Sequence, residues 1–407
     1  MITELELDRI LDTWLAEGAE HVPAEDLSLA LRQVDRTRQR RSFPAWRVPH
    51  PARGRAARFS LGVVVTLLAV SASWTAIRSV PQDIGAVSID ALDFPWAAGE
   101  LASDALAFTA VMPAGGPEAV YWRVAAYDRF DLQGWTQTVD ERAEVPAGGS
   151  LLRGSAEAAP DVLTKAVSAT IRRGPSIEGL LISPGTPVRV DADARVRTLG
   201  ADAWLAAVKV PATTYTVEAR VLRLDESGII SPARLRAAGS DYPGDVAERY
   251  TAVPAAALGP KVRELLAEIL SSTPSRDPYD IAVAIESYLR GPDHFRYDVT
   301  PAPCDNASLI ECFAQTRSGY CLHYASTMAI LLRSALPSNP VPTRLVQGFL
   351  PGERSGTIET VSNRLAHAWV EVYFAGVGWI PFDPTGGAIG RPSIIPLDVR
   401  PSGPAVP

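Results

Sequence analysis

The sequence predicts an α+β protein in which a β-rich half comes before a helical region and a closing β-hairpin. Short β-prone runs, separated by glycine and proline, occupy residues 79–240. Helical periodicity begins near residue 241, and two further β-prone runs joined by a glycine-containing turn follow at 367–382. With 47% hydrophobic and 21% charged residues, the 407-residue chain has a globular composition and is long enough for two domains.

The first part of the chain contains a predicted transmembrane helix at residues 59–78. Residues 59–77 carry no charge, and at about 1.5 Å per residue such a helix is long enough to span a hydrocarbon core. Residues 31–58 hold nine arginines against one aspartate, an excess that stays in the cytoplasm. The rest of the chain is therefore expected outside. The alternatives are a buried core helix and a cleaved signal peptide, although a 58-residue leader far exceeds an ordinary n-region.

Residues 79–240 are expected to form a β-sandwich-like domain, because their apolar and polar side chains alternate as in a half-buried strand, for example in TTYTVEARV. Beyond residue 241, PKVRELLAEILSS and DPYDIAVAIESYLRG carry apolar residues three and four apart. Pro260 and Pro278 lie near the first turns of these segments, where proline is tolerated. A layer of helices is therefore expected before Cys321.

Composition and motifs argue against several classes of function. The net charge of −7 disfavours a nucleic-acid binder, because phosphate neutralisation needs a basic face and none dominates the bulk of the chain. The three cysteines and five histidines form no paired CxxC or HExxH motif, and no EF-hand, phosphate-binding glycine loop or GxGxxG motif occurs. We therefore expect no nucleic-acid partner, no metal and no cofactor.

The stretch SGYCLHYASTMAILLRSA places Cys321 in the first turn of a predicted helix, with Gly319 allowing a tight entry. The positive end of the helix dipole favours the thiolate, which is the nucleophilic form of cysteine. One apolar stripe is formed by Ala325, Met328, Ala329 and Leu332. Because a lone cysteine is more often a buried structural residue than a nucleophile, a catalytic role for Cys321 requires partners.

Two candidate partners occur in LAHAWVEVYFAGVGWIPFDPTGG, residues 365–387. His367 opens a predicted strand at 367–374, and Asp383 follows a second predicted strand at 378–382. Taken singly, the histidine is as readily structural as catalytic, and an aspartate before proline is commonly a turn residue. The combination with Cys321 is what indicates catalysis.

The length of the turn between these strands decides whether the two side chains meet. With an even-membered turn, Asp383 opposes Val370 and points away from His367. A turn of three or five residues, or a bulge, places Asp383 opposite Trp369 and within diagonal reach of His367. In that second arrangement the carboxylate orients the imidazole, and the other ring nitrogen faces Cys321.

The segments GYCLHYASTMAILLRS, RLVQGF, AHAWVEVYF and GWIPFDPT occur in this order. Together they resemble the transglutaminase-like core of bacterial membrane-anchored proteins, a branch of the papain-like cysteine enzyme superfamily. The resemblance covers about residues 242–387 and extends to YWRVAAYDRFDLQGW at 121–135. It implies that Cys321 is the nucleophile, His367 the base and Asp383 the orienting carboxylate. It also implies an α+β core in which the cysteine helix packs against an antiparallel sheet.

The same resemblance suggests a supporting role for Gln315, six residues before Cys321, at the spacing of a papain-like oxyanion-hole glutamine. An exposed surface residue is the alternative, and the backbone N–H of Cys321 is the safer oxyanion donor. His323 is expected to project away from the thiol. Cys304 and Cys312 can form a disulfide if this domain lies outside the cell, which leaves Cys321 as the free thiol.

These features predict a membrane-anchored cysteine acyl-transfer enzyme that acts on amide bonds of proteins or peptides outside the cytoplasm, through a Cys-His-Asp triad and a thioester. A transglutaminase-like acyltransferase, a cysteine peptidase and an amidase all use this machinery. A catalytically silent cell-envelope binding or scaffold module is the alternative function. The oligomeric state is left open. The expected segments are a cytoplasmic segment (1–58), a transmembrane helix (59–78), a β-rich extracytoplasmic domain (79–240), a catalytic core (241–390) and a proline-rich tail (391–407).

Overall fold

The computed structural model describes residues 103–386, except 114–119, 139–140, 153–160, 178, 200–203, 224–229, 274, 303 and 305–307. The described residues all belong to one compact unit. The predicted cytoplasmic segment, transmembrane helix and proline-rich tail lie outside them. Within the described ranges, no helix combines the length and the apolar character needed to cross a bilayer.

The described strands form two large antiparallel sheets. The larger sheet has seven described strands, in the spatial order β17 (Gly378–Phe382), β16 (Ala366–Phe374), β13 (Thr343–Phe349), β2 (Trp122–Tyr127), β9 (Trp204–Lys209), β8 (Ala194–Leu199) and β5 (Glu141–Val145). The other has six described strands, in the order β14 (Glu353–Ser355), β15 (Ile358–Ser362), β1 (Leu106–Val111), β6 (Thr164–Arg173), β10 (Thr214–Leu222) and β7 (Thr186–Val190). Two short pairs complete the strands of the described part, β3 (Arg129–Phe130) with β4 (Trp135–Thr136), and β11 (Arg296–Tyr297) with β12 (Ser318–Gly319).

Strands from both halves of the sequence share these sheets. In the larger sheet, β2 from the β-rich half pairs directly with β13 of the second half. In the other sheet, β15 from the second half pairs with β1. The domain boundary predicted between residues 240 and 241 stays a prediction. Strands from before and after this boundary pair within the same sheets. The α+β class with antiparallel sheets is confirmed.

The alternation predicted for TTYTVEARV is also found. In β10 the side chains of Tyr215, Val217 and Ala219 are buried, whereas Thr214 and Glu218 are exposed. Alternate residues of a strand point to opposite faces of the sheet, so this strand buries one face and exposes the other.

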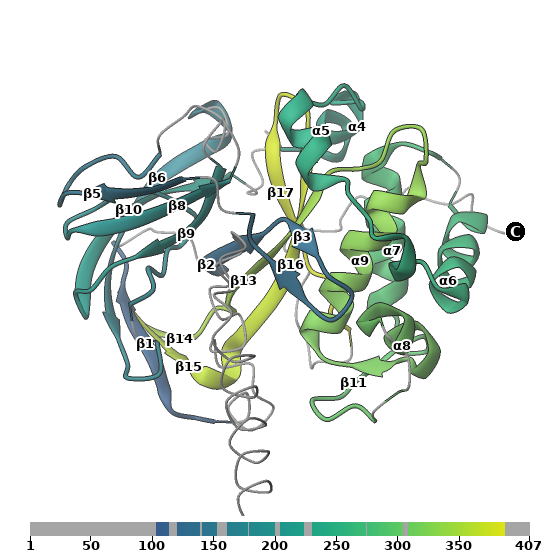
Figure 1. Cartoon of the computed structure of the whole chain (residues 1–407). Coiled ribbons are helices and arrows are strands. Elements are labelled where there is room, and N and C mark those ends of the chain that lie inside the picture. The colour runs from purple at the N-terminus through teal and green to yellow at the C-terminus, as the bar shows by residue number, and fades with distance from the viewer. Residues whose placement is uncertain are drawn as a thin grey trace, which may run out of the picture. The chain divides into compact units, whose positions relative to one another are not determined.

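The α-helices of the described residues lie in the second half of the chain. They are α4 (Pro232–Ala237), α5 (Gly244–Tyr250), α6 (Pro260–Ser271), α7 (Pro278–Arg290), α8 (Leu309–Thr316) and α9 (Cys321–Ala335), with short 3-10 turns at Asp161–Leu163, Ala255–Ala257 and Asn363–Leu365. Pro260 and Pro278 occupy the first turns of α6 and α7, as predicted. In Figure 1, helices α6–α9 gather on one side of β2, β13 and β16, and the six-stranded sheet lies on the other.

Helix α9 is the centre of the helical layer and packs against β13, β16 and the helices α6, α7 and α8. The predicted stripe Ala325, Met328, Ala329 and Leu332 is buried, but so are most other side chains of this helix. A helix that is covered nearly all round belongs to the core, which explains why its hydrophobic pattern extends beyond one face.

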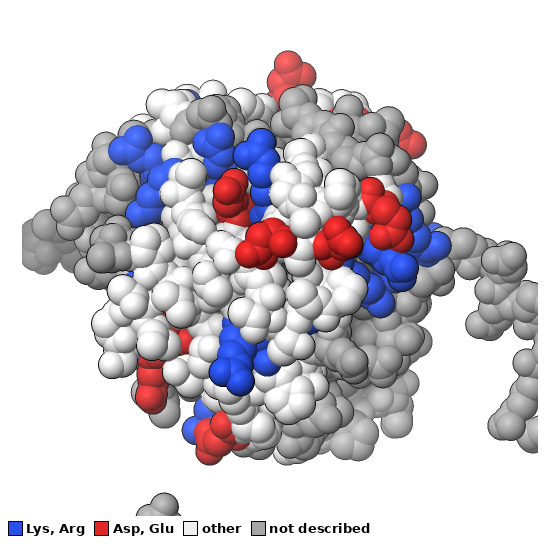
Figure 2. Space-filling view, turned by 90° about the vertical axis from the view of Figure 1, so that its left-hand side faces the viewer, with Lys and Arg blue, Asp and Glu red and all other residues white. Residues whose placement is uncertain are grey.

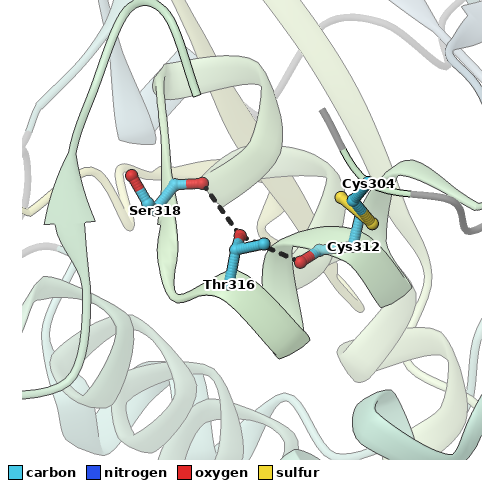
Figure 3. Close-up of a disulfide and its surroundings, with 4 residues drawn as sticks. All are labelled: Cys304, Cys312, Thr316 and Ser318. Carbon is cyan, nitrogen blue, oxygen red and sulfur yellow. Dashed lines mark hydrogen bonds between the residues drawn. A yellow bond between two sulfur atoms is a disulfide. The ribbon is translucent and has the colours of Figure 1, made fainter. Parts of the chain in front are cut away.

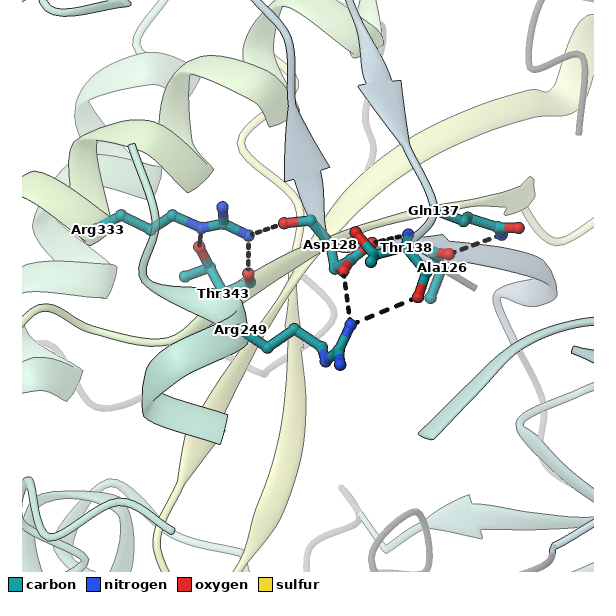
Figure 4. Close-up of polar contacts among 7 residues, drawn as sticks. All are labelled: Ala126, Asp128, Gln137, Thr138, Arg249, Arg333 and Thr343. Carbon is teal, nitrogen blue, oxygen red and sulfur yellow. Dashed lines mark hydrogen bonds and ion pairs between the residues drawn. The ribbon is translucent and has the colours of Figure 1, made fainter. Parts of the chain in front are cut away.

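A buried arginine ties α9 to the sheet at the end far from Cys321. Arg333 is 2% exposed, and its guanidinium donates to the carbonyl oxygens of Asp128 at 2.8 Å, Ala252 at 2.8 Å and Thr343 at 2.5 Å. Figure 4 shows this group beside the ion pair of Arg249 with Asp128, whose closest N–O distance is 3.3 Å. A buried charge is tolerated only when it is paired and hydrogen-bonded. These contacts therefore fix β2, β13 and α9 relative to one another.

Figure 2 views the side of the molecule formed by the β-rich sheets, where basic and acidic side chains lie next to one another. Two exposed ion pairs illustrate the pattern, Arg195 with Glu144 at 2.7 Å and Arg189 with Glu218 at 3.6 Å. Such exposed pairs each contribute at most about 1 kcal/mol to stability.

Candidate active site

Cys321 is the first residue of α9, and the chain reaches it through a short extended segment. Gly319 lies in β12, and a Cβ at this position would come within 2.8 Å of the His323 ring and 2.9 Å of the Phe313 ring. Glycine is therefore required for space at the entry to the helix. Tyr320 is the extended N-cap residue. The N–H groups of the first helical turn have no partner within the helix and form its positive end, and Cys321 lies in this turn.

His367 lies in β16, and the turn between β16 and β17 has three residues, 375–377. Phe374 pairs with Gly378 across this turn, and Val370 pairs with Phe382 at the far end. Continuing this register places Asp383 opposite Trp369, one diagonal step from His367. The odd-membered arrangement considered from the sequence is therefore the one found. Positive φ values at Gly376 (69°) and Gly378 (101°) show why glycine is required at two positions of this connection.

The side chains of His367 and Asp383 meet directly. The distance from His367 Nε2 to Asp383 Oδ2 is 2.8 Å. The other ring nitrogen, Nδ1, is then left for Cys321, and a hydrogen bond between the Cys321 and His367 side chains contributes to the electrostatics of the ring. Cys321 is 0% exposed, His367 1% and Asp383 0%. The structure thus brings the three predicted residues together in a buried cluster.

Burial and charge act in opposite directions on this cluster. Burial lowers the pKa of His367, but the negative charge and hydrogen bond of Asp383, with a smaller contribution from Cys321, outweigh burial and raise that pKa from 6.5 to about 9. Burial would also raise the pKa of Asp383, yet His367 and the hydrogen bonds from Thr385 lower it below the usual value. Both shifts favour the ion pair of an imidazolium with a carboxylate.

Asp383 is held by four residues that sequence reasoning did not identify. Its carboxylate accepts the Tyr121 hydroxyl at 2.8 Å and the Thr385 backbone N–H at 3.0 Å. Its own backbone N–H donates to Glu286 at 2.9 Å, and its carbonyl accepts from Arg290 at 2.8 Å. Glu286 and Arg290 are one turn apart on α7, so this helix binds both the backbone N–H and the carbonyl of Asp383.

One of these residues left a signal in the sequence. Glu286 is 1% exposed and lies among the buried residues of α7, such as Ile285 and Leu289. A carboxylate on the apolar face of a helix must be paired when it is buried, so its position in the hydrophobic pattern was informative. Tyr121 opens the segment 121–135 that carries part of the resemblance, but nothing in the sequence indicated that it contacts Asp383, which lies 262 residues away.

The remaining sequence-derived candidates occupy different surroundings. Gln315 is exposed on α8, and its oxyanion role stays a prediction. His323 accepts a weak hydrogen bond from the Tyr320 N–H at 3.4 Å, and burial lowers its pKa to about 4, so this neutral ring is part of the packing at the start of α9. Trp369 and Trp379 are both buried, at 2% and 7% exposed.

Cys304 and Cys312 form a disulfide, and Cys321 is the buried free thiol. The disulfide joins the segment before α8 to α8 itself. Figure 3 shows it together with Thr316 and Ser318, which follow Cys312 in the chain. The Thr316 hydroxyl contacts the Cys312 carbonyl at 3.0 Å and the Ser318 carbonyl at 3.3 Å, immediately before Cys321. In the described part of the chain, no group of three or more His, Cys, Asp or Glu side chains is arranged to hold a metal ion.

The sequence is similar to one family model and to known proteins. Residues 265–384 match the model of the transglutaminase-like superfamily. The chain is 32% identical over 199 residues to the uncharacterized protein YebA of Bacillus subtilis (strain 168), covering 47% of this chain and 25% of YebA. It is 40% identical over 94 residues to a protein-glutamine gamma-glutamyltransferase of Pseudomonas aeruginosa, covering 22% of this chain and 13% of that protein. The chain thus spans a quarter or less of the length of these relatives.

A solved structure is also similar, the periplasmic domain of TgpA from Pseudomonas aeruginosa. The identity is 25% and the TM-score 0.49, over 71% of this chain and 91% of that domain. The family match over residues 265–384 includes α9 with Cys321, β16 with His367, and Asp383 after β17. The similarity to the transglutaminase-like superfamily therefore spans all three residues of the buried cluster.

Proposed function

We propose that Cys321, His367 and Asp383 are a catalytic triad for acyl transfer. The observation that supports this most strongly is the buried His367–Asp383 pair, joined at 2.8 Å, with the second ring nitrogen left for a cysteine in the first turn of a helix. A nucleophile, a base and a group that orients the base are the parts that covalent acyl transfer requires.

In the proposed reaction, the Cys321 thiolate attacks the carbonyl carbon of an amide. The His367 imidazolium gives its proton to the leaving nitrogen, the C–N bond breaks, and ammonia or an amine departs from a thioester on Cys321. An incoming amine or water then gives a proton to His367 and attacks the thioester carbonyl. The C–S bond breaks, the product is a new amide or a carboxylic acid, and the thiolate–imidazolium pair is restored.

The tetrahedral intermediates carry an oxyanion that needs donors. The backbone N–H of Cys321, free of intrahelical partners at the start of α9, is the proposed donor, and Gln315 is a second candidate. The positive end of the helix also favours the developing negative charge.

For the substrate we propose protein or peptide amides, with the side-chain amide of glutamine as the first acyl donor to test. One relative is named a protein-glutamine gamma-glutamyltransferase, and this name supports glutamine as the acyl donor. Whether the acceptor is an amine or water depends on the surroundings of the site rather than on the triad.

We propose further that the protein is membrane-anchored through residues 59–78, with its N-terminus in the cytoplasm and its catalytic core outside. The arginine-rich segment before residue 59 supports this orientation. The Cys304–Cys312 disulfide is of the kind that persists in oxidising compartments, which supports an extracytoplasmic core.

The test is capture of the thioester. The protein is incubated with a glutaminyl dipeptide without an amine, and its intact mass is measured; the expected gain is the mass of the dipeptide less ammonia, located on Cys321 by peptide mapping. Hydroxylamine should release the adduct as a hydroxamate. Cys321→Ala should abolish the adduct, and His294→Gln is the matched control, because His294 stacks on Tyr288 away from the cluster. Absence of any acyl adduct with all amide donors tested would favour the scaffold alternative.

A further inference from the structure

Tyr121 contacts the candidate site from the opposite half of the sequence. It directly precedes β2, and its hydroxyl donates to Asp383 Oδ2 at 2.8 Å, the same oxygen that His367 contacts. Its ring centroid lies 6.1 Å from that of His367 and 5.2 Å from that of Trp369. Tyr121 lies outside residues 265–384, the part of the chain that matches the family model.

A glycine in the strand between β2 and β16 leaves room for the backbone of Trp122, the residue that follows Tyr121. Gly348 of β13 pairs with His367 on one side and with Arg123 on the other. A Cβ at Gly348 would lie 1.9 Å from the Trp122 carbonyl oxygen and 2.9 Å from the Trp369 ring. Without a side chain at this position, residues near the start of β2 can contact those of β16 across β13.

A second pair of side chains crosses β13 in the same way. Arg123 contacts both carboxylate oxygens of Glu371 in β16, at 2.8 and 2.9 Å, and Arg344 of β13 contacts the same carboxylate at 2.7 Å. All three are buried. This ion cluster holds the start of β2 next to β16, so the position of Tyr121 is fixed by contacts beyond its own.

The carboxylate of Asp383 has donors on both oxygens. Oδ2 accepts from His367 and Tyr121, and Oδ1 accepts from the Thr385 N–H at 3.0 Å. Other charged groups near His367 are occupied elsewhere: Glu371 is bound by Arg123 and Arg344, while Glu286 and Arg290 bind the Asp383 main chain. Cys321 approaches the ring from α9. Tyr121, directly before β2, is therefore the side chain from the first half of the chain that acts on the charge of Asp383.

We propose that Tyr121 is a positioning residue for the reaction proposed above, whose hydroxyl fixes the Asp383 carboxylate and limits how tightly that carboxylate holds the His367 imidazolium. The sign follows from the charges. The hydroxyl stabilises the carboxylate most when His367 is neutral, because an adjacent imidazolium already offsets part of the negative charge. Tyr121 thus makes His367 a better proton donor to the leaving group, and its removal makes His367 hold its proton more tightly.

The test compares Tyr121→Phe with the wild-type protein by NMR titration of His367, using histidine labelled at Cε1. The pKa of His367 is expected to rise by roughly half a pH unit, about a threefold gain in proton affinity. Tyr127→Phe is the matched control: Tyr127 is the buried last residue of β2, and its hydroxyl donates to Gln347 instead of the site. An unchanged or lower pKa of His367 in Tyr121→Phe, with the fold intact by circular dichroism, overturns the proposal.

A second variant keeps the proposal testable if Tyr121→Phe does not fold. Incorporation of 4-aminophenylalanine at position 121 keeps the aromatic ring and replaces the hydroxyl with a weaker, neutral N–H donor, so the pKa of His367 should rise; a fall or no change counts against the proposal. The positioning role rests on the proposed function, but the titration needs no substrate, so the two proposals can fail separately. A protein that shows the titration response but forms no thioester retains the positioning role and loses the proposed reaction. In an active protein, Tyr121→Phe should lower kcat and leave KM unchanged. It should also move the alkaline limb of the kcat–pH profile to higher pH.

Discussion

The buried His367–Asp383 pair should make the protein less stable as the pH rises through about 9. The pKa of His367 is raised from 6.5 to about 9, so the folded state binds this proton more tightly than the unfolded chain. The stabilisation is fully present below pH 6.5 and is lost as the pH rises through the folded value. A rise of about two to three pH units corresponds to roughly 3 kcal/mol. The lowered pKa of Asp383 reflects the same interaction and is not counted again.

Two measurements check this prediction. The first is NMR titration of the His367 Cε1 signal, assigned by its disappearance in His367→Gln. The second is urea unfolding between pH 6 and 9.5 in both proteins, because the difference between their curves removes the contribution of other titrating groups. We expect the wild type to lose its advantage over His367→Gln as the pH approaches 9.5. Asp383→Asn removes the charge that opposes burial, so in this variant His367 should titrate well below 9.

A His367 pKa at or below 6.5 in the wild-type protein would refute the reasoning, because burial would then outweigh the carboxylate. A parallel pH dependence of wild type and His367→Gln would have the same meaning. Activity provides an independent check, since loss of the imidazolium above pH 9 should remove the proton that the leaving group needs.

Three further predictions concern the framework of the site. Arg333→Met should lower the free energy of unfolding by about 3–5 kcal/mol in urea titrations, because the buried carbonyls of Asp128 and Thr343 and the partly buried carbonyl of Ala252 lose this donor; a loss under 1 kcal/mol would contradict this. Replacing Cys304 and Cys312 by serine should cost about 2–3 kcal/mol by loop entropy, measured as a fall in Tm, and the wild type in reductant should show the same fall. A fragment of residues 241–390 should aggregate, because it leaves β13 without β2, and a soluble folded fragment would disprove this.

Local features of the fold were predictable from the sequence because they depend on residues close together in the chain. The helix beginning at Cys321, the strands of the β16–β17 hairpin and the N-terminal prolines of α6 and α7 follow from periodicity, glycine placement and proline geometry. The length of the turn between β16 and β17 was not fixed by the sequence. A catalytic role required an odd-membered or bulged turn, because only such a turn lets His367 meet Asp383. The register of β16 and β17 shows the three-residue case.

The order of the strands was not predictable in this way. A strand's own pattern states which face is buried, but not which partner it will pair with. In the sequence, β2 belongs to the β-rich half, but in the sheet it lies between β13 and β9. Likewise, the β14–β15 hairpin belongs to the predicted catalytic core, but β15 pairs with β1 of the β-rich half. These pairings join segments more than 200 residues apart, so no local window contains both partners.

The interleaved sheet explains why part of the candidate site was found from the sequence and part was not. Cys321, His367 and Asp383 lie within about 60 residues of one another and within the region that matches the family model. Tyr121 is added by β2, whose place beside β13 depends on Gly348 and on the Arg123–Glu371 contact. Because Tyr121 binds the Asp383 carboxylate from outside residues 265–384, that matched region does not contain the whole candidate site. The catalytic unit that we propose therefore includes β2, and any test of the triad requires both halves of the sheet.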